Sequence, residues 1–146
     1  LIALFGDDAY INNTLNRDYL RSQIFKDKDL LSKMNAIVHP KVGAHFKRWV
    51  KKQKAPYILK EVAIIFENNL QNQYDYIITV IADKEERVKR VMQRDNSSRD
   101  SVKAIIRNQL SDQEKIKKSD FVIENNDSEA AKLQAQIIHN NLISNI

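Results

Sequence analysis

The pattern of hydrophobic and polar residues changes period several times along the chain, and each change predicts an element. Continuous apolar runs at Tyr76–Ile81 and Phe121–Ile123 are typical of short buried strands, and Tyr57–Leu59 is a further short run of β-favouring residues. The run Val62–Phe66, which Glu67 closes, fits either an extension of the strand at Tyr57 or the start of a buried helical turn. We therefore expect short strands in the second part of the chain.

Before Tyr57 the apolar residues recur at helical spacing, so residues of about 14–53 are expected to form a helical block. Asn16 or Thr14 is placed to cap a first helix. A second helix is expected from about Asp27 to His39, and Pro40 can open a third one because its missing N–H is not needed in a first turn.

After Tyr76 the strands alternate with helices. The strand at Tyr76–Ile81 is followed by a helix that bears Arg87, Arg90 and Arg94, then by a break at Ser97 and a second helix from about Ser101. The tail after the strand at Phe121 is amphipathic to about Ile143. This alternation predicts an α/β fold with a parallel sheet and crossover helices, to which the helical block is added as an insertion or cap.

Composition narrows the class of protein. A chain of 146 residues with 42% hydrophobic residues is long enough for one ordinary domain. The absence of cysteine excludes disulfides and thiolate metal sites, and no apolar run is long enough to span a membrane, so a cytoplasmic protein without a membrane partner is expected. The net charge of +5 is compatible with nucleic acid, anionic lipid or a polyanionic small ligand.

Arginines after a strand are the first candidates for chemistry. Arg90 and Arg94 are four residues apart, so they share one helix face beyond the carboxyl end of a strand, where open parallel sheets bind ligands. Arginine binds phosphate through forked, charge-assisted hydrogen bonds. Ordinary surface ion pairs, such as one between Glu86 and Arg90, are the alternative interpretation. Because Gly6 and Gly43 are the only glycines, the chain contains no glycine-rich phosphate loop.

Each of the other candidate site residues can have a binding or catalytic role or an ordinary structural role. Asn125 and Asn126 follow a strand and can hydrogen-bond a purine edge or form a turn. Arg17 can reach a phosphate or remain solvated, and His39 can face a ligand or end a helix. Glu67 can act as a base or hold magnesium through water, or it can simply bound the apolar run. His45 and His139 lack partners at ligand spacing, so we expect no structural metal site.

Six segments, taken in order, together resemble the dephospho-coenzyme A kinase family over nearly the entire chain. Each is weak alone, and the order and gaps make the resemblance specific. The segments are Leu15–Leu20 with Ile24-Phe25, Val38-His39-Pro40, Val62–Glu67, Val88–Asp95, Gln109 and Asp120–Asn126.

The resemblance implies a fold, a division of the chain and an activity. The fold is a P-loop NTPase-like three-layer parallel sheet with a helical substrate-binding insertion and a lid. Residues 1–146 would be one partial domain, with a coenzyme-binding region at 11–53, a core at 54–82 and 119–146, and a lid at 83–118. The activity would be transfer of the γ-phosphoryl group of ATP to the 3′-hydroxyl of dephospho-coenzyme A, the last step of coenzyme A synthesis, with Mg²⁺.

The resemblance also implies residue roles. Arg90 matches the family's catalytic arginine, whereas the others match binding positions: Arg94, Asn125 and Asn126 for ATP, and Arg17, His39 and Glu67 for the substrate.

The sequence departs from the family at its beginning. The family opens with a strand, a glycine-rich loop with lysine and an Asp-x-Asp pair, and none of these precedes Leu1. Most of the magnesium site belongs to those parts. We therefore expect a fragment that is inactive alone and whose exposed sheet edge favours a homo-oligomer.

Three alternatives to this family remain at the level of sequence. One is another small-molecule kinase of the nucleoside monophosphate type. The second is a basic nucleic-acid-binding module without catalysis, although the aromatic residues form no stacking array among the lysines, so no nucleic-acid partner is expected. The third is a pure interaction module.

Overall fold

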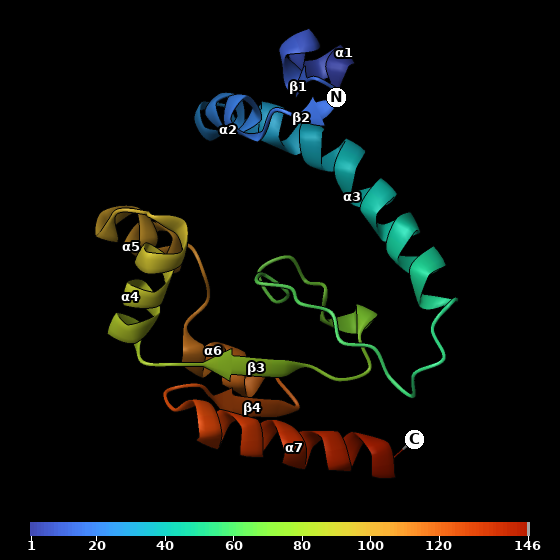
Figure 1. Ribbon diagram of the computed structural model, residues 1–146, viewed down its shortest axis with the longest axis vertical. Helices are drawn as coiled ribbons and strands as arrows, with labels where there is room; N and C mark the ends of the chain where they lie inside the picture. The colour runs from blue at the N-terminus through green and yellow to red at the C-terminus, as the bar shows by residue number, and fades with distance from the viewer. Residues whose placement is uncertain (146) are drawn as a thin grey trace. The chain divides into compact units, whose positions relative to one another are not determined.

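A computed structural model describes residues 1–145, apart from the side chains of residues 25 and 26, and it contains two compact units, Leu1–Ile58 and Leu59–Ile146. The first unit begins with the short helix α1 (Ile2–Phe5), the 3-10 helix η1 (Asp7–Ala9) and a hairpin (Figure 1). The hairpin joins β1 (Tyr10–Ile11) to β2 (Thr14–Leu15) in antiparallel pairing. Its turn residues Asn12 and Asn13 both have positive φ, the conformation that asparagine tolerates and that two-residue hairpins require.

Two helices complete the first unit. Asn16 caps α2 (Arg17–Lys26) by accepting a hydrogen bond from the backbone of Tyr19, as the sequence predicts. Asp27 caps α3 (Lys28–Val50) in the same way. A small core of Phe5, Ala9 and Leu20 joins α1, η1 and α2.

The predicted helix boundary at His39 and Pro40 is wrong, because α3 runs through both residues. A proline inside a helix removes one backbone hydrogen bond and crowds the preceding turn. In α3 the proline lies within a helix of 23 residues whose start is capped by Asp27. The local preference of proline for the first turn of a helix is thus overridden by its surroundings in α3.

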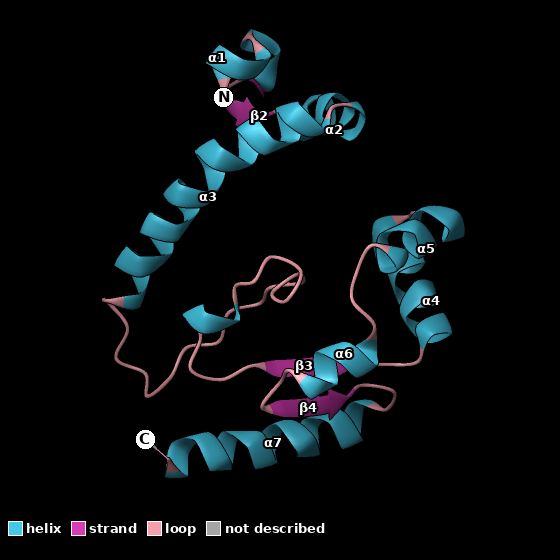
Figure 2. Cartoon of the chain, turned by 180° about the vertical axis from the view of Figure 1, so that it is seen from behind, coloured by secondary structure: helices cyan, strands magenta, loops and turns pink. Residues whose placement is uncertain are grey.

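The second unit contains a parallel pair of strands with helices around it (Figures 1 and 2). β3 (Ile78–Ile81) and β4 (Phe121–Glu124) are in register from Ile78 opposite Phe121 to Ile81 opposite Glu124. The segment that crosses between them contains α4 (Lys84–Asp95), α5 (Arg99–Arg107) and α6 (Asp112–Lys117). The prediction of parallel strands joined by helical crossovers is confirmed.

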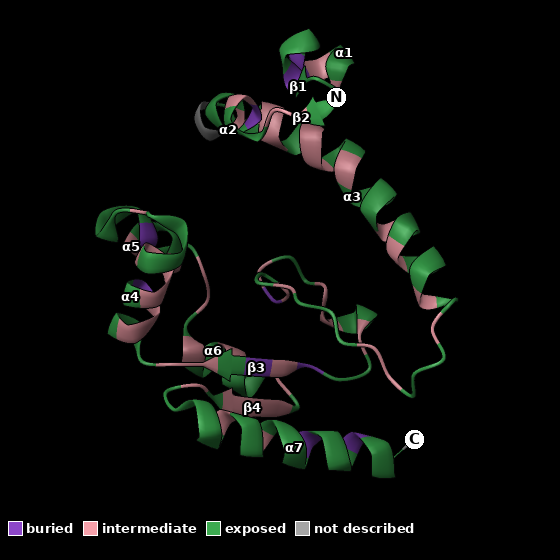
Figure 3. Cartoon of the chain, in the orientation of Figure 1, coloured by how far each residue is buried: buried purple, intermediate pink, exposed green. Residues whose placement is uncertain are grey.

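Helices pack on both strands. α6 contacts β3, and α7 (Ser128–Ser144) lies along β4. The buried residues of this unit come from the turns before η2, from β3 and the residue before it, and from α4, α5 and α7, as the purple segments of Figure 3 indicate. They are Phe66, Ile77, Thr79, Val88, Val102, Ile138 and Leu142.

The predicted strand at Tyr57–Leu59 is wrong. These residues are irregular, Leu59 is 70% exposed, and among the described residues no strand pairs with them. A β-favouring run needs a neighbour for its backbone groups, and without one it gains little from extension. The following run, Val62–Phe66, leads into turns that end before η2 (Gln71–Gln73), so the alternative of a strand extension is excluded.

Candidate functional site

The start of α4 lies at the carboxyl edge of the parallel strands. Asp83 follows β3, and its Oδ1 accepts hydrogen bonds from the backbone N–H groups of Glu85 and Glu86 at 2.9 and 3.2 Å. Parallel strands present their carboxyl ends at the same edge, so the turn after β4 lies close to this cap. The backbone N–H of Asp83 donates to the side-chain Oδ1 of Asn126 at 2.7 Å.

Arg90 makes a second connection to that turn. Its Nη1 donates to the backbone carbonyl of Asn125 at 2.8 Å, and its Nε donates to Glu86 Oε1 at 3.0 Å. The Arg90 side chain remains 40% exposed, and two of the five guanidinium N–H groups are used by these partners. The structure thus brings together three of the predicted site residues, Arg90, Asn125 and Asn126.

Arg94 lies on the last turn of α4, away from these contacts. Its guanidinium binds both carboxylate oxygens of Asp95, at 2.8 and 2.9 Å, and its side chain is 74% exposed. The hydrogen bond from Arg94 to Asp95, together with the charge of Asp95, raises the pKa of Arg94 above its ordinary value. In this structure Arg94 therefore forms a surface ion pair with Asp95. The pair between Glu86 and Arg90, which the sequence offered as the simpler interpretation, is present as well.

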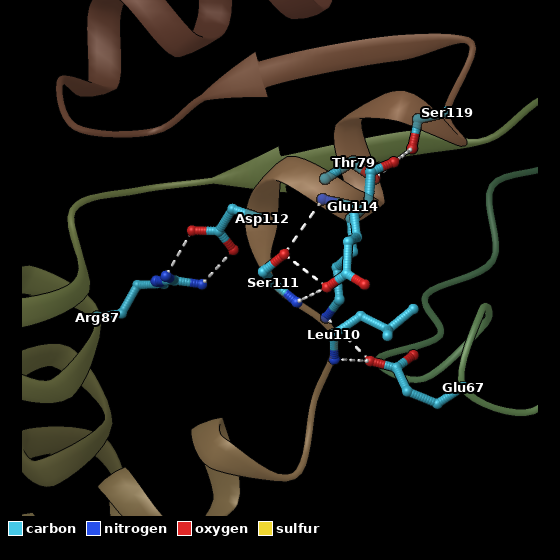
Figure 4. Close-up of polar contacts among 9 residues, drawn as sticks. Glu67, Thr79, Arg87, Leu110, Ser111, Asp112, Glu114 and Ser119 are labelled. Atoms are coloured by element: carbon cyan, nitrogen blue, oxygen red, sulfur yellow. Dashed lines mark hydrogen bonds and ion pairs between the residues drawn. The ribbon is translucent and has the colours of Figure 1, made fainter.

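Glu67 is bound to the segment between α5 and α6 (Figure 4). Its Oε1 accepts a hydrogen bond from the backbone N–H of Leu110 at 2.9 Å and lies 3.3 Å from Lys115 Nζ. Burial alone would raise the pKa of Glu67, but backbone N–H groups of Leu110 and of Glu67 itself, with Lys115, lower the pKa below its ordinary value of 4.5. The contacts with this segment therefore favour the ionised form of the carboxylate.

A second ion pair, between Arg87 and Asp112, joins α4 to the start of α6. The sequence analysis did not predict it. Arg87 binds Asp112 with both ends of its guanidinium, Nη1 to Oδ1 at 3.0 Å and Nη2 to Oδ2 at 2.7 Å. Figure 4 shows this fork between α4 and the start of α6. Neighbouring Ser111 and Glu114 form a capping box, which is the sequence signal that could have found α6.

A hollow of about 740 Å³ lies beside the exposed side of α4. Its lining combines charges of both signs with an apolar methionine side chain and the amide of Asn126. The lining residues are Asp83, Glu85, Glu86, Lys89, Met92, Gln93, Arg99 and Asn126.

Arg17 and His39 belong to the first unit. Arg17 is the first residue of α2, and His39 lies within α3; both are exposed. An N-terminal helix position and an exposed cation together are suited to an anion, since the helix dipole favours negative charge there. The structure gives neither residue a partner that assigns it a role.

Within residues 1–145, no group of three or more histidine and carboxylate side chains is placed to hold a metal ion. Among the same residues, no helix combines the length and apolar character needed to cross a membrane.

The parallel strands and their helical crossovers make this an α/β protein, a class in which ligands bind outside the carboxyl ends of the strands, where Arg90 lies. A family model described as dephospho-CoA kinase matches residues 1–131. The chain therefore belongs to the dephospho-CoA kinase family.

Individual relatives agree with this assignment. A dephospho-CoA kinase from Fusobacterium nucleatum is 37% identical over 127 residues, which are 86% of this chain and 66% of that protein. One from Listeria monocytogenes is 35% identical over 142 residues, 94% of this chain and 70% of that protein. The chain thus spans about two thirds of the length of the curated relatives it matches.

Solved structures match as well. The crystal structure of TT1252 from Thermus thermophilus is 31% identical with a TM-score of 0.81, covering 94% of this chain and 73% of that one. A dephospho-CoA kinase from Campylobacter jejuni matches with a TM-score of 0.57 over 99% of this chain and 75% of that one; its identity of 23% supports the fold alone.

Proposed function

We propose that this chain forms the substrate-binding, core and lid parts of a dephospho-CoA kinase. The reaction transfers the γ-phosphoryl group of ATP to the ribose 3′-hydroxyl of dephospho-coenzyme A. Residues 11–53 bind the coenzyme, residues 83–118 form the lid, and residues 54–82 and 119–146 belong to a P-loop NTPase-like core. The family assignment supports this proposal, and so does the contact of Arg90 with the turn at the carboxyl edge of the sheet.

Arg90 is proposed as the catalytic residue. Phosphoryl transfer depends mainly on positioning and on neutralisation of the charge that the three equatorial oxygens carry. Arg90 is anchored at Nε and Nη1, so its orientation is set before a ligand arrives, and its other N–H groups can donate to phosphate oxygens. A fixed cation loses little freedom on binding, which favours the transition state.

The other roles follow the same assignment. Asn125 and Asn126 are proposed to lie near the adenine of ATP, and Arg94 is proposed to exchange Asp95 for a phosphate. Arg17 and His39 are proposed to bind dephospho-coenzyme A. Glu67 is proposed to lie near the acceptor, at the root of the lid.

We assign no residue of this chain to the family's glycine-rich loop, to its lysine or to a Mg²⁺ site. The described residues offer no cluster of acidic side chains and histidines that fits a metal ion. Magnesium in kinases is bound by one or two carboxylates and by substrate phosphates.

The product of the complete coding sequence tests the proposal. With ATP and dephospho-coenzyme A, Arg90→Ala is expected to lower kcat about 100- to 1,000-fold with little change in KM, because the lost charge acts mainly in the transition state. Lys132→Ala, which removes an exposed positive charge from α7, is the matched control and should keep wild-type rates.

Two results would contradict the proposed function. One is a folded protein that phosphorylates adenosine or cytidine monophosphate but not dephospho-coenzyme A, which favours a nucleoside monophosphate-type kinase. The other is salt-sensitive binding of an oligonucleotide without either activity, which favours a nucleic-acid-binding module.

A further inference from the structure

We propose that Asp112 is a positioning residue for Arg90. Its carboxylate binds Arg87, which is close to Arg90 on α4, and thereby fixes the rotation of the helix that carries the catalytic guanidinium. This inference rests on the proposed function, because it assigns a remote group to the same site.

The fork between Arg87 and Asp112 is suited to fixing an orientation. Both carboxylate oxygens are bound, at 3.0 and 2.7 Å, and the two side chains are only 30% and 35% exposed. A two-point contact between planar groups restricts rotation, which a single hydrogen bond or an ammonium group does not. The buried Nε of Arg87 has no partner among the described residues, so Asp112 supplies both hydrogen bonds that the structure gives this guanidinium.

Arg87 and Arg90 lie on the same helix, so a rotation of α4 about its axis displaces both side chains. Residues three apart on an α-helix are separated by about 60° around the axis and about 4.5 Å along it. A rotation of α4 that releases Arg87 from Asp112 therefore displaces the base of the Arg90 side chain by a similar angle. The hydrogen bond from Arg90 to the Asn125 carbonyl depends on that angle.

Asp112 is itself held by the core of the second unit (Figure 4). It opens α6, whose Ser111–Glu114 capping box defines the first turn. Glu67 binds the segment just before this turn at Leu110 and the helix itself at Lys115. The contacts thus form a continuous connection from Glu67 through α6 and Asp112 to Arg87 and α4.

Steady-state kinetics of the complete coding-sequence product test this inference. Asp112→Asn keeps the shape of the side chain but removes the charge and one of the two acceptors. We expect kcat to fall about tenfold or more, with KM for both substrates within about threefold, because misplacement of a catalytic group acts on the transition state. Glu129→Gln, which removes an exposed ion pair with Lys132, should have wild-type kinetics.

A double-mutant cycle separates positioning from a merely structural role. If Asp112 acts through Arg90, then Asp112→Asn should cause no further loss of kcat in the Arg90→Ala background. Arg87→Lys keeps the positive charge but loses the two-point contact with Asp112. It should also lower kcat in the wild-type background and not in the Arg90→Ala background, and it replaces Asp112→Asn in the cycle if that variant does not fold.

The outcomes are distinguishable. An active wild type in which the losses from Asp112→Asn and Arg90→Ala multiply, or in which Asp112→Asn leaves kcat unchanged, would overturn the inference alone. An inactive wild type would overturn the proposed function and the inference with it.

Discussion

Glu67 and Lys115 form an ion pair at 3.3 Å in which each side chain is only 16% exposed. Ion pairs with so little water around them are costly to break on one side, because the remaining charge is left in a poorly solvated place. This pair also joins the turns before η2 to α6, so it affects both the stability of the second unit and the position of α6.

Neutralising this carboxylate should destabilise the protein and change its response to acid. Glu67→Gln leaves Lys115 without its counter-charge and is expected to cost about 1–3 kcal/mol at pH 7. Since the pKa of Glu67 is lower in the folded protein than its ordinary value of 4.5, its contribution is present above that value and is lost as pH falls through the folded pKa. The wild type should therefore lose more stability than Glu67→Gln below about pH 4.5.

Denaturant unfolding at several pH values between 7 and 3 measures both effects. Glu129→Gln, whose partner Lys132 is exposed, is the control and should leave the midpoint unchanged. Equal acid sensitivity in wild type and Glu67→Gln would contradict the assigned direction of the pKa change.

The core of the second unit depends on Val88, which is fully buried in α4. Val88→Ala removes about two methylene equivalents and leaves a cavity, so we expect a loss of about 2 kcal/mol by thermal or chemical unfolding. Val42→Ala, at a valine of α3 that is 57% exposed, makes the same chemical change in a helix and should cost nothing measurable. Similar costs at both positions would contradict the assigned burial.

Asn96 ends α4 in the left-handed conformation, with φ of 49°. Asn96→Gly should be neutral or slightly stabilising, and Asn96→Ala should cost about 1 kcal/mol, because a β-carbon is unfavourable at this φ and glycine has none. Asn108 ends α5 with φ of −87°, so Asn108→Ala lacks this penalty. Melting temperatures of the three variants check the ranking, and an Asn96→Ala protein as stable as Asn96→Gly would contradict it.

Among the described residues β3 pairs with β4 alone, so one edge of β3 has no strand beside it. We propose that this edge pairs with a second copy of the chain, as unpaired strand edges tend to do. Light scattering of the 146-residue chain should then give a dimer, and Val80→Lys on β3 should shift it toward monomer, whereas Val42→Lys should not. A monomer at high concentration for the wild type would refute this proposal.

Much of the fold could be predicted because its signals are local. The strands β3 and β4 and the helices α4, α5 and α7 are marked by apolar period and by capping residues close in sequence. The prediction of a strand at Tyr57–Leu59 is wrong because a strand needs a neighbouring strand to pair with. A local sequence pattern does not show whether such a neighbour is present. The continuity of α3 through Pro40 likewise depends on the helix as a whole rather than on one residue.

In the candidate site, too, some contacts could be predicted from the sequence and others could not. The proximity of Arg90 to Asn125 could be predicted, since both follow parallel strands and such ends share an edge. The contacts of Glu67 with Leu110 and of Arg87 with Asp112 join residues 43 and 25 positions apart. Their pairing is set by the packing of α6 against β3, which single-sequence patterns do not specify.

Pro40 has a consequence for the long helix of the first unit. It has no N–H to offer the carbonyl of Ala36, so this position lacks one of the backbone hydrogen bonds of a regular helix. The series of hydrogen bonds along α3 is therefore interrupted at Pro40. Bending of its two halves concentrates at this joint, and nearby amide hydrogens should exchange faster than those at either side.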